Sequence, residues 1–64
     1  MPEVYVHVVR GRSHEQKRAL IKDITDAVVR NFAVPADAVL VEIVEADPAL
    51  KAKGGVLFSE RPPR

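Results

Sequence analysis

Apolar positions along the chain follow two periods that predict its main elements. Residues 3–9 are rich in β-branched and aromatic types, with Val4, Val6 and Val8 on one side and a mixed opposite side, which predicts a strand. A long helical period follows, and residues 39–45 form a second apolar run that predicts another strand. Parallel strands need a long crossover, usually a helix, so this order predicts a β-α-β unit with parallel strands and a right-handed crossover.

The predicted helix has a start signal and a stop signal. Ser13 and Gln16 have the spacing of a capping box, and Gly11 marks the turn before them. The helix is expected to end within residues 31–33, because Pro35 disfavours helical geometry at the residue before it. Positions expected on the apolar face are Leu20, Ile24, Ala27, Val28 and Phe32, and those expected in solvent are Lys17, Lys22, Asp26 and Arg30.

Shorter signals follow the second strand. Residues 47–50 predict a turn or one helical turn, and residues 51–55 are expected to be flexible. Residues 56–58 are apolar, and we expect them to pair as a short strand or hairpin with another subunit, ahead of a flexible tail at 59–64. The fold class is therefore α+β: a single β-α-β domain over residues 1–64, with a short C-terminal hairpin.

Size and composition predict an oligomer. A chain of 64 residues buries only about 60% of the surface that it exposes when unfolded. It has no cysteine and only two histidines, so we expect no disulfide and no metal site. Because 47% of the residues are hydrophobic, we expect apolar surface to be buried between subunits.

Charge and hydropathy exclude other classes. The net charge is +1 with both signs interspersed, and three aromatic residues are too few for a base-stacking platform, so no nucleic-acid partner is expected. No apolar run approaches the ~20 residues of a membrane span, and no signal-peptide pattern opens the chain. We expect a cytoplasmic protein without a membrane partner.

Two residues are candidates for chemistry. Removal of Met1 would give Pro2 a free secondary amine at the start of a rigid strand, and partial burial can tune such an amine into a general base near neutral pH. Arg12, in the turn after the strand, can hold a carboxylate by two parallel hydrogen bonds. The intervening strand is about 25 Å long at ~3.3 Å per residue, so a site using both residues would lie between subunits.

These features resemble the 4-oxalocrotonate tautomerase family. The shared pattern is an N-terminal proline, a valine-rich strand and a Gly-Arg-Ser-x-Glu-Gln-Lys motif, here residues 11–17, and residues 51–59 are similar to a tail in related tautomerases. The resemblance implies a cofactor-independent keto–enol isomerase acting on 2-hydroxydienoates or α-keto acid enols. It implies Pro2 as the general base and Arg12 as the ligand of a substrate carboxylate. It also implies a homohexamer built as a trimer of dimers.

The chain departs from the family pattern at two places. An arginine early in the second strand, which polarises the substrate's keto oxygen, is replaced here by Leu40. A pocket phenylalanine before the glycines is replaced by Lys51, with Leu50 beside it. We expect Leu40, Leu50 and Lys51 to form pocket wall. An apolar Leu40 suits a monocarboxylate enol with an aromatic or alkyl tail. Lys51, Lys53 and Arg61 are the candidates to replace the missing cation.

Two alternatives stay open. Relatives use the same amine for hydration–dehalogenation or decarboxylation, which needs a carboxylate to activate water, and Glu42 and Glu45 are available. The chain could also be a non-catalytic partner subunit of a hetero-oligomer, since Leu40 replaces an expected site residue.

Overall fold

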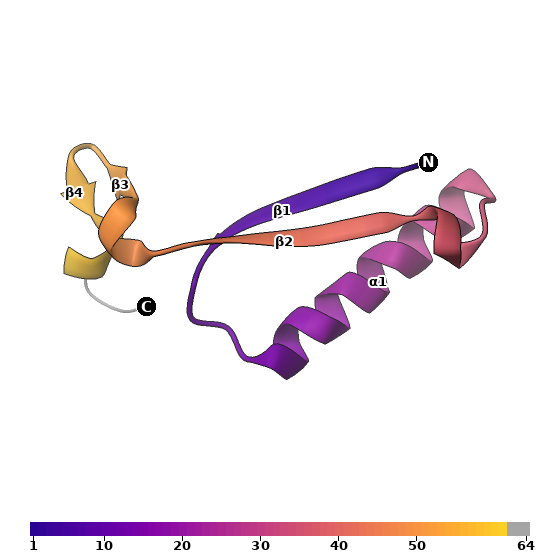
Figure 1. The fold of residues 1–64 in the computed structure, drawn as a ribbon, viewed down its shortest axis with the longest axis horizontal. Helices are drawn as coiled ribbons and strands as arrows, with labels where there is room; N and C mark the ends of the chain where they lie inside the picture. Colours follow the sequence, from indigo (N-terminus) through magenta and orange to yellow (C-terminus); the bar gives the residue numbers. More distant parts are fainter. Residues whose placement is uncertain (62–64) are drawn as a thin grey trace.

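A computed structural model describes residues 1–61 of the chain. Its elements in chain order are strand β1 (Glu3–Val9), helix α1 (His14–Phe32), strand β2 (Leu40–Ala46) and strands β3 (Ala52–Lys53) and β4 (Val56–Leu57). Single 3-10 turns lie at Ala36–Ala38, Pro48–Leu50 and Phe58–Glu60. The α+β class and the β-α-β order predicted from the sequence are confirmed (Figure 1).

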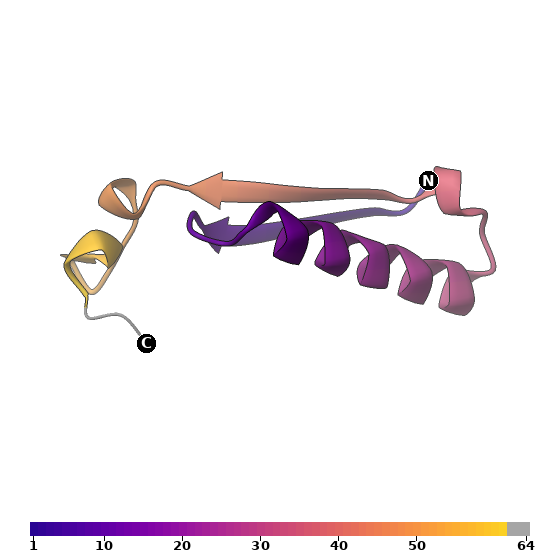
Figure 2. The same cartoon turned by 90° about the horizontal axis from the view of Figure 1, so that it is seen from below.

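The body of the protein has two layers, a two-stranded sheet and one helix. Strands β1 and β2 are parallel along their full length, from Glu3 opposite Leu40 to Val9 opposite Ala46. Figure 2 shows α1 along one face of this sheet. Val8 and Ile43 line a pocket together with residues of α1, so the side of the sheet that carries them faces the helix. The opposite face of the sheet is covered by no other element within the described residues.

Helix α1 starts and ends as its sequence predicts. The Ser13 hydroxyl oxygen accepts from the Gln16 backbone N–H at 3.1 Å, and the Gln16 side-chain oxygen accepts from the Ser13 backbone N–H at 3.0 Å. This reciprocal pair is a complete capping box. At the other end Ala33 is left-handed (φ 55°) and donates to the Val29 carbonyl, which closes the last turn.

The prediction of which α1 residues face the sheet is partly wrong. Leu20 and Phe32 are 41% and 66% exposed, and Lys17 lies against the sheet with its ammonium 3.2 Å from both carboxylate oxygens of Glu45. The physical reason is width: two strands ~4.8 Å apart cannot cover the whole apolar stripe of a helix about 10 Å across. None of residues 1–61 is fully buried, so the protomer has no closed core of its own.

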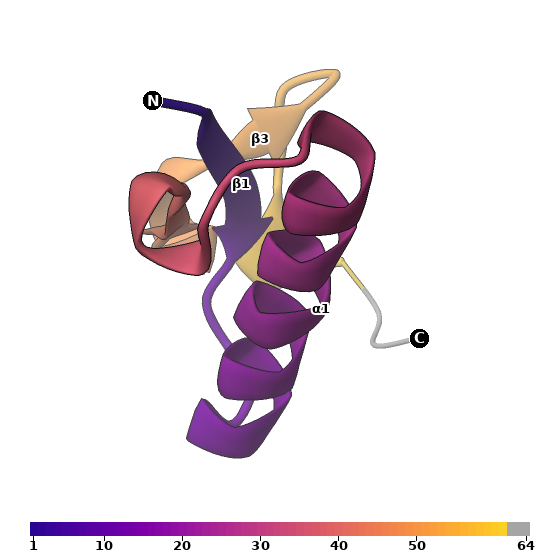
Figure 3. The same cartoon turned by 90° about the vertical axis from the view of Figure 1, so that its right-hand side faces the viewer.

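Residues 47–61 form a C-terminal arm that lies beyond the end of β2, away from α1 (Figure 1). The molecule therefore measures 43 × 22 × 15 Å. In the end-on view of Figure 3 the arm lies behind β1. In the arm, β3 and β4 form an antiparallel hairpin within the chain. Gly54 and Gly55 have φ of 62° and 80°, as a tight hairpin turn requires at both of its central residues.

One expectation for the arm needs correction and another is met in part. Residues 51–55 contain β3 and a defined turn instead of a flexible segment, because the two glycines permit that turn. The apolar segment that follows, expected to pair as a short strand or hairpin with another subunit, forms a hairpin with β3 of its own chain, and the Phe58 N–H donates to the Lys51 carbonyl at 2.8 Å. The expected contact with another subunit stays a prediction. Of the tail expected at 59–64, Ser59 and Glu60 belong to a 3-10 turn, and residues 62–64 lie outside the described part.

Candidate active site

The first candidate region lies at the start of β1. Pro2 is half-buried, and its carbonyl accepts from the Leu40 backbone N–H at 2.9 Å. This bond continues the parallel ladder by one residue and brings the proline next to Leu40, whose side chain is 38% exposed. The strand pairing thus joins the predicted base with one predicted wall residue.

A phenol and a carboxylate follow on the face of the sheet away from α1. The Tyr5 hydroxyl donates to the Glu3 carboxylate at 2.6 Å. This hydrogen bond and the negative charge of Glu3 raise the pKa of Tyr5 above its ordinary 10.0, because both favour the protonated phenol. The outer face near Pro2 therefore has acidic character.

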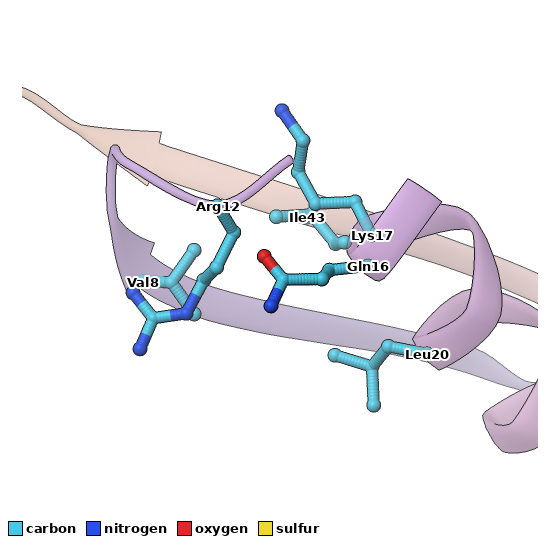
Figure 4. A pocket seen from close by; sticks show the side chains of 6 residues that line it. All are labelled: Val8, Arg12, Gln16, Lys17, Leu20 and Ile43. Atoms are coloured by element: carbon cyan, nitrogen blue, oxygen red, sulfur yellow. The ribbon is translucent and has the colours of Figure 1, made fainter. Parts of the chain in front are cut away.

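The second candidate region lies beyond the other end of β1. Arg12 follows Gly11 (φ 144°), and its guanidinium donates to the Val9 carbonyl at 3.3 Å. Arg12 borders a pocket of about 180 Å³ between β1, β2 and the first turns of α1 (Figure 4). The lining residues are Val8, Arg12, Gln16, Lys17, Leu20 and Ile43. A guanidinium beside an apolar floor suits a carboxylate that carries a hydrocarbon group.

The two regions do not meet within one chain. Strand β1 has seven residues and spans about 23 Å at ~3.3 Å per residue, with Pro2 before it and Arg12 after it. The pocket at Arg12 is also smaller than the ~300 Å³ at which ligand pockets usually begin. Neither region alone therefore brings Pro2 and Arg12 together or offers a pocket of the usual size.

The other two predicted wall residues lie in the arm, at the far end of β2 from Pro2. Leu50 is 84% exposed, whereas Lys51 is half-buried and its carbonyl receives the Phe58 N–H. Among predicted site residues that are distant in the sequence, the chain itself brings together Pro2 and Leu40.

Contacts of the remaining candidates limit their availability. Arg61 donates to the Lys53 carbonyl at 2.8 Å and lies 5.6 Å from the centre of the Phe58 ring, so it holds the arm together. Glu45 is bonded to Lys17, whereas Glu42 is exposed on the outer face. From the sequence, Gln16 was identified as a cap residue and as part of the shared motif at residues 11–17, but not as a pocket residue. Its spacing of four from Arg12, at a helix start, was the available signal that both could border one pocket.

Two further searches cover residues 1–61. No group of three or more histidine, aspartate or glutamate side chains in this part of the chain is arranged to hold a metal ion. The same residues include no helix with the length and hydropathy needed to cross a bilayer.

The chain is a small β-α-β protein that has a proline directly before β1 and an arginine at the edge of its pocket. Comparison with known proteins shows which family it belongs to. The sequence model described as "Tautomerase enzyme" matches residues 2–61, and the chain belongs to this family. It is 49% identical over 61 residues to a probable tautomerase of Bradyrhizobium diazoefficiens, covering 95% of this chain and 91% of that protein. It is 37% identical over 60 residues to a 2-hydroxymuconate tautomerase of Pseudomonas putida, covering 94% and 95%.

Solved structures agree with this assignment. A 4-oxalocrotonate tautomerase homologue superposes with a TM-score of 0.90 at 33% identity, covering 98% of this chain and all of that one (100%). A chain of the heterohexameric 4-oxalocrotonate tautomerase from Chloroflexus aurantiacus superposes with a TM-score of 0.83 at 32% identity, covering 94% and 97%. The resemblance seen in the sequence is confirmed at the level of family and fold.

Proposed function

We propose that this chain is a cofactor-independent keto–enol tautomerase whose general base is the amine of Pro2, freed by removal of Met1. The observation that carries the proposal is the place of Pro2, half-buried at the head of a hydrogen-bonded strand, in a chain that belongs to the tautomerase family. The amine takes the proton of the enol hydroxyl and a proton is returned to carbon. The C=C and O–H of the enol thereby become C–H and C=O, with no net gain or loss of atoms.

The proposed site is shared between subunits of a homo-oligomer, most simply a hexamer built as a trimer of dimers. Pro2 of one protomer and Arg12 of another supply the base and the carboxylate ligand. Large exposed apolar side chains, including Phe32 (66%) and Leu50 (84%), and the absence of a fully buried residue among 1–61 support burial between copies.

The proposed substrate is a small enol carboxylate. Arg12 binds the carboxylate, and Leu40 beside Pro2 gives the reacting end an apolar wall. We infer that a monocarboxylate enol with an alkyl or aromatic tail fits better than a dicarboxylate dienol. Leu50 and Lys51, carried on the arm, are proposed as wall residues of a neighbouring subunit's site.

Replacement of Pro2 tests the proposal. Pro2→Ala should lower kcat for ketonisation of phenylenolpyruvate and 2-hydroxymuconate by about 10²–10⁴-fold, the usual contribution of a general base. A matched control is the wild-type sequence with Met1 retained, checked by intact mass, because Pro2 is then an amide that cannot take a proton. Equal rates for the wild type, Pro2→Ala and the Met1-retaining form would exclude Pro2 as the base.

Leu40 also favours a second candidate, a non-catalytic subunit of a hetero-oligomer. The heterohexameric Chloroflexus aurantiacus relative shows that such assemblies occur in the family. Light scattering and an activity assay of the chain expressed alone distinguish the catalytic proposal from this alternative. A defined homohexamer with turnover supports the catalytic proposal. An inactive or unassembled chain supports the alternative.

A further inference from the structure

The orientation of the Gln16 side chain is fixed by its role as a cap. A backbone N–H can only donate, so the side-chain atom 3.0 Å from the Ser13 nitrogen must be the Gln16 amide oxygen. The amide NH₂ is consequently the free end of this side chain. Figure 4 shows it turned to the same side of the pocket as the Arg12 guanidinium.

The other groups around this pocket leave it with two kinds of free donor. Arg12 uses one of its five N–H donors on the Val9 carbonyl and keeps the others. The Lys17 ammonium is bonded to Glu45, so Lys17 contributes its stem to the pocket. The remaining lining, Val8, Leu20 and Ile43, is apolar and offers a surface for the hydrocarbon part of a carboxylate.

We propose that Gln16 is a second substrate-binding residue, whose amide NH₂ donates a hydrogen bond to the carboxylate held by Arg12. The inference rests on the proposed function, because it concerns the same carboxylate. Arg12 supplies the charge, and Gln16 supplies a neutral donor held in place by the capping box.

The choice of glutamine over glutamate at this position supports the role. Both residues complete a capping box equally well, since either provides an oxygen for the backbone N–H. A glutamate would place a carboxylate beside Arg12, where it would pair with the guanidinium and repel an anionic substrate. Glutamine caps the helix while leaving Arg12 available.

Gln16→Glu keeps the cap, removes the donor and places a carboxylate beside Arg12, so Gln16→Met, which removes the donor without adding a charge, is measured beside it. We expect the KM for phenylenolpyruvate to rise about tenfold or more, as loss of a hydrogen bond to a charged group predicts, with Tm and kcat little changed. The matched control is His14→Glu, which adds the same charge in the same helical turn at a residue that does not line this pocket. Its KM should stay within about twofold of the wild type.

A binding measurement makes the result independent of turnover. The dissociation constants of cinnamate, a carboxylate, and cinnamide, its neutral analogue, are measured by NMR titration of the wild type and the three variants. Weaker cinnamate binding in both Gln16 variants, with His14→Glu and cinnamide binding unaffected, supports the inference even if the wild type ketonises no enol, which would refute the proposed function instead. An unchanged cinnamate constant in Gln16→Met, or no cinnamate binding by the wild type, overturns the role of Gln16.

Discussion

The two ends of β1 differ in chemistry as well as in position. At its start, a half-buried proline lies next to Leu40, and the outer face nearby carries the Tyr5–Glu3 pair. Beyond its end, Arg12 and Gln16 border a pocket with an apolar floor. The proposed base and the proposed anion ligand are thus kept apart by a rigid strand of about 23 Å. Under the proposed function, each protomer would carry two half-sites, and assembly would join them.

Mixing defective subunits tests this division with the largest expected effect. Pro2→Ala and Arg12→Ala should each be nearly inactive alone. When the two are refolded together in equal amounts, random assembly should give about a quarter of the sites an intact Pro2 from one subunit and an intact Arg12 from another. We therefore expect phenylenolpyruvate turnover to recover to about a quarter of the wild-type value.

Two controls define this experiment. Wild-type protein refolded in the same way measures losses in refolding, and native mass spectrometry of the mixture verifies that subunits have exchanged. If exchange is complete and activity stays at the level of the single variants, both residues of a site come from one chain and the division is wrong.

Adding a positive charge next to Pro2 should change the substrate preference, an effect of intermediate size. Leu40→Arg places a cation beside the proposed base, where it can hold a second carboxylate. We expect kcat/KM for 2-hydroxymuconate to rise relative to phenylenolpyruvate by about tenfold, the free energy of one charge-assisted hydrogen bond. Val56→Arg adds the same charge to the arm and should leave the ratio unchanged. The same ratio in Leu40→Arg and the wild type would show that Leu40 does not face the substrate.

Local signals explain why the body of the protein was predictable. The Ser13–Gln16 capping box, Pro35 after the helix and two β-branched runs each act within a few residues of where they stand. They determine where α1 begins and ends, and why the strands on either side of it are parallel. Parallel pairing in turn accounts for the separation of Pro2 from Arg12.

Contacts between distant parts of the chain could not be predicted from the sequence, because the apolar pattern does not tell which apolar residues face the sheet and which stay exposed. Leu20 and Phe32 share the helical period with inward-facing Ile24 and Val28, yet they remain exposed in the protomer. Lys17 has the appearance of a solvent residue, but the charge of Glu45 on β2 draws it onto the sheet. Gln16 had one evident role as a cap, and only the pocket beside Arg12 reveals a second.

The smallest expected effect concerns the charge at the Pro2 end. The Glu3 carboxylate raises the pKa of Tyr5, so the phenol should be half-ionised above pH 10.0 in the folded protein. Tyr5 is the only tyrosine and the chain has no tryptophan, which makes ultraviolet absorbance at alkaline pH a direct readout. Glu3→Gln should lower the midpoint towards 10.0, and Glu42→Gln should lower it less, because Glu42 acts only through its charge.

The Tyr5 hydroxyl donates only while it is protonated. Any stabilisation of the fold from the Tyr5–Glu3 contact is therefore present below the unfolded pKa of Tyr5 and lost as the pH rises through its folded pKa. An unchanged midpoint in Glu3→Gln would mean that the Tyr5–Glu3 contact does not form, and the acidic character assigned to this end of β1 would lose its main support.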